Sequence, residues 1–155
     1  WLRLCSAGML AGARHFGLAP DPRLRVHIED GRAWLAASHA QFDVIMLDAY
    51  DDQSIPATLM DADFFQLVAA RLAPGGVVMQ NVYVPIVDTR RLLSAMRAAF
   101  AQVDVYKVGQ SAVLAAYAGP QRTPSQLQAR ALLLDAELRP AHALAEQLNY
   151  RVPAL

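Results

Sequence analysis

The sequence predicts an α/β protein with a doubly wound, mostly parallel sheet. Segments with strand character alternate with segments of helical character, and such alternation places helices on both faces of a sheet. The chain of 155 residues is 55% hydrophobic and 18% charged, which suits one domain with a well-filled core. A third observation is FDVIMLDAYDD, an apolar strand that leads directly into three aspartates.

Three strands and three helices are expected up to residue 100. The strands are residues 23–28, 42–47 and 77–82. The helices are residues 31–38, 61–72 and 88–100, of which the last two carry apolar side chains at amphipathic spacing. We expect the second helix to end at residues 73–76, because Pro74 cannot continue it and a glycine can adopt the left-handed cap.

Two further strands, residues 104–108 and 112–118, are separated by only three residues, so we expect an antiparallel hairpin. The pattern then breaks, and Thr123 followed by Pro124 marks a helix start. Residues 127–138 and 141–148 are the last two expected helices. The sequence therefore predicts a sheet domain over residues 1–119 and a helical appendage over residues 120–155.

The composition excludes several classes of function. Formal net charge is zero, so no overall field attracts nucleic acid or an anionic membrane, and neither is expected as a partner. Cys5 is the single cysteine, which excludes an internal disulfide and fits a reducing cytoplasm. No apolar run reaches the ~20 residues that a membrane span needs. The four histidines show no metal-ligand spacing, so no metal is expected.

Asp48 is the strongest candidate for chemistry. It follows a strand that we expect in the interior of the sheet, and open α/β sheets bind ligands beyond the carboxyl ends of their strands. A nearby Asp51 would disfavour two negative charges at once and raise the pKa of one carboxyl toward a useful range for a base. Asp52 is expected to face solvent, and Tyr50 either lines the pocket along an aliphatic chain or packs. The alternative for the whole segment is a loop of solvated aspartates.

Two other strand ends carry polar candidates. Asp30 could receive the amino group of a heterocycle, with Gly31 allowing close approach of the backbone; the alternative is an ordinary turn and helix cap. Gln80 and Asn81 interrupt an apolar strand near its end. Because buried amides need partners, they either hold the neighbouring backbone or line the crevice, with Tyr83 on the same rim.

In this order the segments resemble the spermidine synthase family, the polyamine aminopropyltransferases. That family is built on the Rossmann-like nucleotide-binding fold of class I S-adenosylmethionine-dependent methyltransferases. The likeness runs from about residue 13 to residue 118. ARHFGL with DPRLRVHIEDGRAWL resembles the family's adenine-contact region, FDVIMLDAYD its catalytic strand end, and FFQLVAARLAPGGVVMQN its next helix, turn and strand.

The resemblance implies a role for each matching position. Asp30, with Gly31 beside it, would contact the adenine of the donor. Asp48 would help remove a proton from the attacking amine, Asp51 would hold that amine, and Gln80 matches a glutamine near the substrate channel. The implied donor is decarboxylated S-adenosylmethionine, or S-adenosylmethionine itself, as a co-substrate that is not tightly bound. The implied acceptor is a diamine such as putrescine, and because the family is commonly dimeric, a homodimer stays open.

The sequence also departs from the family's pattern. It has Asp-Ala-Tyr-Asp-Asp where the best-characterised synthases have Asp-Ser-Ser-Asp-Pro, and it has no glycine-rich first strand. Within WLRLCS, Leu4 and Ser6 stand where an acid would bind the donor's ribose, and the family's N-terminal β domain is absent. We therefore expect a fragment or an altered copy. In the strand order of the methyltransferase fold, the missing first strand would lie between a further strand expected at residues 1–5 and the strand at residues 42–47. Its absence leaves two sheet edges to rearrange or to pair with another chain.

Three functions follow as alternatives. The first is aminopropyl transfer with Asp48 as base, an activity that is lost if this chain does not bind its donor. The second is an S-adenosylmethionine-dependent methyltransferase on the same fold. The third is a non-catalytic pseudo-domain that pairs with another chain across its sheet edges.

Overall fold

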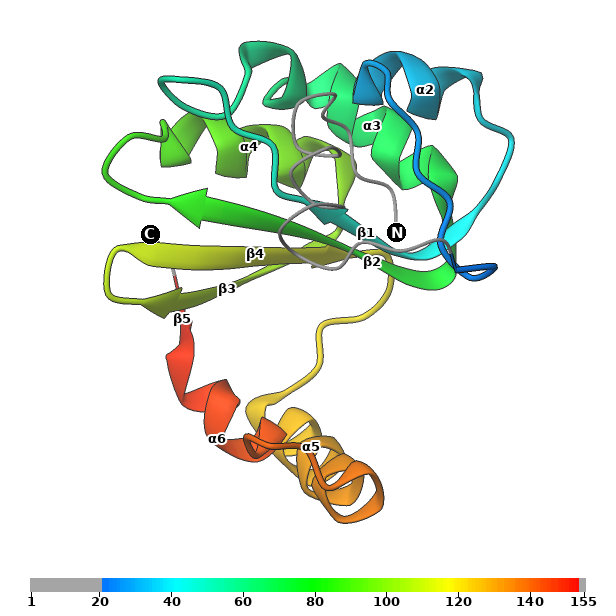
Figure 1. The fold of residues 1–155 in the computed structure, drawn as a ribbon. Coiled ribbons are helices and arrows are strands. Elements are labelled where there is room, and N and C mark those ends of the chain that lie inside the picture. Colours follow the sequence, from blue (N-terminus) through cyan, green and yellow to red (C-terminus); the bar gives the residue numbers. More distant parts are fainter. Residues whose placement is uncertain (1–20, 154–155) are drawn as a thin grey trace. The chain divides into compact units, whose positions relative to one another are not determined.

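The computed structural model describes residues 21–153 (Figure 1). The chain divides into two compact units, residues 1–39 and 40–155. In the first unit the described residues form α2 (Gly31–Ala37), which confirms the expected helix. The strand expected over residues 23–28 is not formed in the described structure, and these residues are not part of its sheet. The strand expected at residues 1–5 lies outside the described residues.

The second unit contains the sheet and the remaining described helices. In chain order its elements are β1 (Phe42–Leu47), η1 (Ala57–Leu59), α3 (Ala62–Arg71), β2 (Leu72–Tyr83), α4 (Thr89–Ala99), β3 (Gln102–Val108), β4 (Ser111–Tyr117), α5 (Pro124–Leu138), α6 (Leu144–Gln147), η2 (Leu148–Tyr150) and β5 (Arg151–Val152). Both amphipathic helices are confirmed, and each begins at an aspartate, Asp61 or Asp88, whose carboxylate caps the first turn. No helix formed by residues 21–153 has the length and apolar character to cross a bilayer.

The sheet is mixed, with the strand order β1-β2-β4-β3-β5. β1 and β2 are parallel, whereas the other three neighbouring pairs are antiparallel. The expected hairpin between β3 and β4 is confirmed, and Gly109, with a φ of 58°, supplies the left-handed residue of its turn. The expected parallel pairing is limited to one pair here, because β4 returns from the hairpin into the space between β2 and β3.

β2 is longer at its amino end than the sequence predicts. The expected turn at residues 73–76 is part of the strand, so α3 leads into β2 without a loop. Gly75 adopts a φ of 82°, and the register between β1 and β2 shifts between Phe42 and Val44. Gly76 allows the close approach at this irregularity, since an added Cβ would lie 2.9 Å from the carbonyl oxygen of Phe42.

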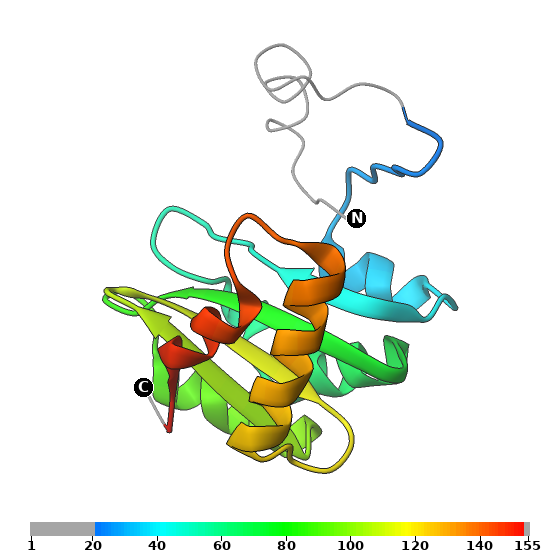
Figure 2. The ribbon, with the colours of Figure 1, turned by 90° about the horizontal axis from the view of Figure 1, so that it is seen from below.

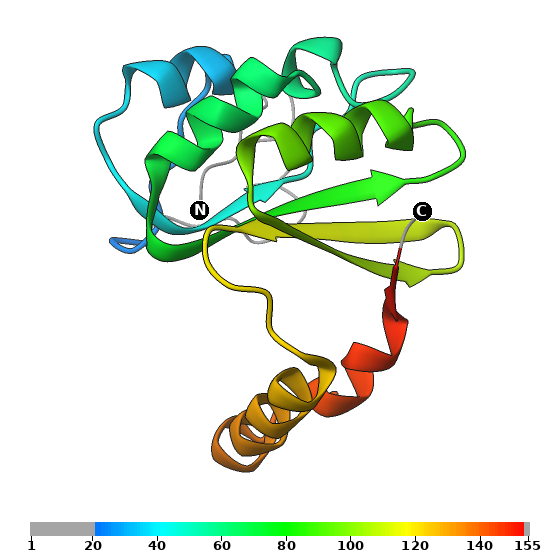
Figure 3. The same cartoon turned by 180° about the vertical axis from the view of Figure 1, so that it is seen from behind.

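Helices α3 and α4 lie side by side on one face of the sheet, and α5 and α6 lie on the other (Figures 1 and 3). The largest apolar side chains that are almost completely buried come from α3, α4 and the strands; they are Phe65, Val68, Val78, Val82, Leu92, Met96, Val105 and Leu114. Burial alternates along the end of β2, where Gln80 and Val82 are buried while Asn81 and Tyr83 are exposed. Every second residue at the carboxyl end of β2 therefore faces solvent.

β1 is confirmed as a strand, but its expected central position is not observed. In the described sheet β1 lies at the edge and pairs with β2 alone. Val44 and Met46 each remain 51% exposed, and Asp43 is exposed as well. A strand that is buried on both faces needs cover over each face. The prediction of full burial is therefore wrong for β1 in this part of the chain.

The carboxyl-terminal tail begins as predicted. Thr123 caps α5 in a capping box with Gln126, and Pro124 lies in the first turn. The following helix is shorter than the expected range, residues 141–148. α6 has only four residues, and the chain continues from it as the 3-10 turn η2.

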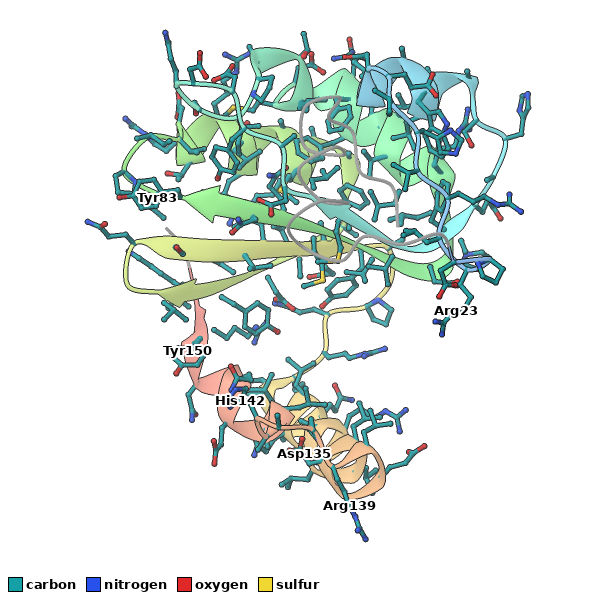
Figure 4. All side chains as sticks on the ribbon, in the orientation of Figure 1. Arg23, Tyr83, Asp135, Arg139, His142 and Tyr150 are labelled. Atoms are coloured by element: carbon teal, nitrogen blue, oxygen red, sulfur yellow. The ribbon has the colours of Figure 1, made fainter. Side chains whose placement is uncertain are left out.

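An aspartate of α5 supplies the cap of α6. The carboxylate of Asp135 accepts hydrogen bonds from the backbone N–H of Leu144 at 2.6 Å and of Ala145 at 3.0 Å. Asp135 is labelled on α5 in Figure 4, and Figure 2 shows α5 and α6 next to each other. The short helix therefore depends on a side chain from its neighbour, which local sequence does not reveal.

A buried ion pair links the end of the tail to the sheet. β5 runs antiparallel to β3 and brings Arg151 to Asp104, whose side chain is only 7% exposed. The Arg151 guanidinium donates to Oδ1 of Asp104 from Nη2 at 2.6 Å and from Nε at 3.2 Å. The hydroxyl of Tyr117 donates to Oδ2 at 3.2 Å. The hydrogen bond with Asp104 raises the pKa of Arg151.

Arg151→Met is expected to lower the free energy of unfolding by about 3 kcal/mol, because it leaves the Asp104 carboxylate buried without its cation. The double variant Asp104→Asn/Arg151→Met removes the charge together with its partner and should recover most of that loss. Urea unfolding followed by circular dichroism measures both values. A single variant as stable as the unmodified chain would show that the pair contributes nothing to folding.

Candidate functional site

Asp48 is the first residue after β1, and its side chain is exposed at the carboxyl end of that strand. In the parallel pair, Leu47 lies beside Gln80, so Asp48, the first residue beyond β1, comes next to Asn81, which is still part of β2. Nδ2 of Asn81 donates a hydrogen bond of 2.8 Å to Oδ1 of Asp48. The structure therefore brings together two residues that the sequence places on separate strand ends.

Gln80 lies beneath this contact. Its side chain is 1% exposed, and Nε2 donates to the carbonyl oxygens of Leu47 at 3.2 Å and of Asn81 at 2.8 Å. These two bonds connect the ends of β1 and β2. Of the two roles considered for the amides, Gln80 holds neighbouring backbone, and its contact with substrate stays a prediction.

The hydroxyl of Tyr50 connects the loop after β1 to β2. It donates to the carbonyl oxygen of Asn81 at 3.2 Å and accepts from the backbone N–H of Tyr83 at 2.8 Å. Partial burial raises the pKa of Tyr50; the hydrogen bond from Tyr83 opposes this rise, and the charge of Asp48 adds to it. The phenol is therefore a protonated donor at neutral pH.

Tyr83 extends the polar cluster to the hairpin between β3 and β4. Its hydroxyl donates to Oε1 of Gln110 at 3.0 Å, and the backbone N–H of Val84 donates to the Gln110 carbonyl at 2.9 Å. Figure 4 shows Tyr83 at the end of β2. The sequence indicated Tyr83 as a rim residue, but it gave no sign of Gln110 beyond a hairpin turn.

Asp51 stabilises its own loop. Oδ1 accepts hydrogen bonds from the backbone N–H of Ser54 at 2.8 Å and of Gln53 at 2.9 Å. These two bonds hold the pKa of Asp51 below its usual value. The expected rise in pKa from paired acids is therefore not found at Asp51, because backbone donors stabilise its charge. Its role in holding an amine stays a prediction, and Asp52 is exposed as expected.

Asp30 and Gly31 belong to the other compact unit. The Asp30 carboxylate accepts a hydrogen bond of 2.8 Å from the backbone N–H of Ala33, which makes it the N-cap of α2, and Gly31 is the first helical residue. Asp30 therefore acts as a helix cap, which is one of the two interpretations of the sequence. A contact between Asp30 and adenine stays a prediction.

Comparison with known proteins identifies relatives of the part of the chain that contains these candidate residues. The family model described as "Spermine/spermidine synthase domain" matches residues 8–114. The polyamine aminopropyltransferase of Nitrosomonas europaea is 37% identical over 95 residues, which cover 59% of this chain and 29% of that protein. The chain spans less than a third of each of the first curated relatives it matches, with 12%, 29% and 28% covered.

Two solved structures show the fold. Human methyltransferase-like protein 13, in complex with SAH, superposes with a TM-score of 0.76 at 22% identity and covers 91% of this chain and 71% of that one. A probable spermidine synthase from Corynebacterium glutamicum has a TM-score of 0.67 at 20% identity, covering 86% of this chain and 53% of that one. Because the family model matches more than half of its length, the chain belongs to the spermine/spermidine synthase family, on a Rossmann-like α/β fold of the class I methyltransferase type.

Proposed function

We propose that this chain carries an aminopropyl-transfer site with Asp48 as the base. The observation that carries the proposal is the exposed Asp48 carboxylate, held by Asn81 at the end of β1 inside the region that matches the synthase family. A carboxylate in this position can accept a proton from an amine while remaining accessible to solvent and substrate.

The reaction is a direct displacement. The amine nitrogen forms a bond to the aminopropyl carbon next to the sulfonium, the carbon–sulfur bond breaks, and its electron pair leaves with sulfur as a neutral thioether. The proton that the nitrogen loses passes to the Asp48 carboxylate. Because the thioether already leaves readily, the protein mainly contributes alignment and a neutral, attacking amine.

The proposed donor is decarboxylated S-adenosylmethionine, and the proposed acceptor is a diamine. The negative charge of the loop after β1 supports this choice. Asp48 and the ionised Asp51 attract the two ammonium groups of a diamine, and they repel the carboxylate that S-adenosylmethionine carries. The SAH bound to the human structural neighbour supports a related adenosyl donor. For the unit of residues 1–39, taken by itself, we further propose that Asp30 and Gly31 form an adenine contact, as the resemblance to the family's adenine-contact region implies.

The donor is tested by calorimetry and by product analysis with putrescine. We expect the purified chain to bind decarboxylated S-adenosylmethionine more tightly than S-adenosylmethionine and to release the thioether only when the amine is present. A clear preference for S-adenosylmethionine would favour a methyltransferase. Binding of neither donor at millimolar concentration would favour a non-catalytic domain and reject aminopropyl transfer by this chain.

Asp48→Asn is expected to lower turnover ~100-fold or more, because the amide cannot accept the proton of the amine. Donor affinity, measured by calorimetry, should change little. Asp52→Asn is the matched control, since it makes the same change on an exposed residue of the same loop and should leave turnover unaltered. Unchanged turnover in Asp48→Asn would remove the proposed role.

Asp51→Asn tests recognition of the second ammonium group of a diamine. The variant should raise KM for putrescine about tenfold and alter kcat less, because it removes a charge-assisted hydrogen bond. The amide oxygen can still accept from Ser54 and Gln53, so the turn is retained. A monoamine of the same length is the control, and its KM should stay the same. Equal losses for both amines would argue against this role of Asp51.

A further inference from the structure

We propose that Asn81 is a positioning residue for Asp48, an inference that rests on the proposed aminopropyl transfer. Its Nδ2 donates the 2.8 Å hydrogen bond to Oδ1 of Asp48, across 33 positions of sequence. The contact arises because β1 and β2 are parallel and keep one register from Val44 beside Val77 to Leu47 beside Gln80. One side-chain amide thereby orients the carboxylate that would accept the proton.

The contact makes the two oxygens of Asp48 unequal. Oδ1 is occupied by Asn81, whereas Oδ2 has no hydrogen-bond partner among residues 21–153. Oδ2 is therefore the oxygen that we propose accepts the proton of the amine. The donor on Asn81 is also neutral, so it orients the carboxylate without the charge of a lysine or arginine, which would repel a diamine.

Asn81 is itself held in place through its backbone. Its carbonyl oxygen accepts hydrogen bonds from Nε2 of Gln80 at 2.8 Å and from the hydroxyl of Tyr50 at 3.2 Å. The same hydroxyl accepts from the N–H of Tyr83 at 2.8 Å. Because these bonds fix the end of β2, the side chain of Asn81 starts from a defined direction. The orientation of Asp48 therefore depends on a connected set of hydrogen bonds that begins at a buried glutamine.

The test is a double-variant cycle on turnover. Asn81→Leu, which keeps similar bulk without a donor, is expected to lower kcat about 10- to 100-fold, while KM for putrescine and donor affinity stay nearly unchanged. In the Asp48→Asn background, the same change should have almost no further effect, because Asn81 acts only through Asp48. Asn149→Leu, an equal change at an exposed asparagine of η2, is the matched control and should leave kcat unaltered.

A second readout does not need turnover. The side-chain amide signals of Asn81 in nitrogen–proton NMR spectra, assigned by their loss in Asn81→Leu, should shift when Asp48→Asn replaces the carboxylate acceptor and should stay in place in Asp52→Asn. Signals that Asp48→Asn leaves in place, or additive losses of kcat in the double variant, would overturn the positioning role while aminopropyl transfer stands. An unmodified chain that binds neither donor and forms no thioether would reject the proposed function and this inference with it.

Discussion

The register between β1 and β2 is the constraint on which the candidate site depends. Leu47 lies beside Gln80, and this places the next residues, Asp48 and Asn81, within hydrogen-bond distance. A slip of one residue would turn the side chains of a strand to the opposite face. The core resists such a slip, because Val78 and Val82 are completely buried and would be moved out of it.

The alternation of buried and exposed residues along β2 gives two neighbouring amides different roles. Gln80 faces the interior and joins two strand ends through its amide, whereas Asn81 faces solvent and holds the carboxylate. Tyr50 returns from the loop to the same carbonyl of Asn81. Asp51 behaves differently, since backbone donors keep it charged and ordered within its own turn. One acid is thus oriented by a neighbouring strand and the other by its own loop.

The two edges of the described sheet differ in how they are closed. On the β3 side, β5 adds two paired residues, and the Asp104–Arg151 ion pair fixes the tail in place. On the β1 side, Val44 and Met46 remain half exposed. The apolar run of residues 42–47 is the pattern of a strand covered on both faces, so the sequence could not reveal the exposed edge that the structure shows at β1.

Features with local causes were predictable from the sequence by itself. The hairpin at Gly109 follows from its short connection, and the start of α5 follows from Thr123 and Pro124. The order of the motifs along the chain also indicated the synthase family. Only the tertiary structure decided the mixed strand order, the edge position of β1, the missing strand over residues 23–28 and the contact between Asp48 and Asn81. The physical reason is separation along the chain. A cap or a turn is stabilised by residues a few positions away, whereas strand pairing and hydrogen bonds across 33 positions exist only once the core has brought the partners together.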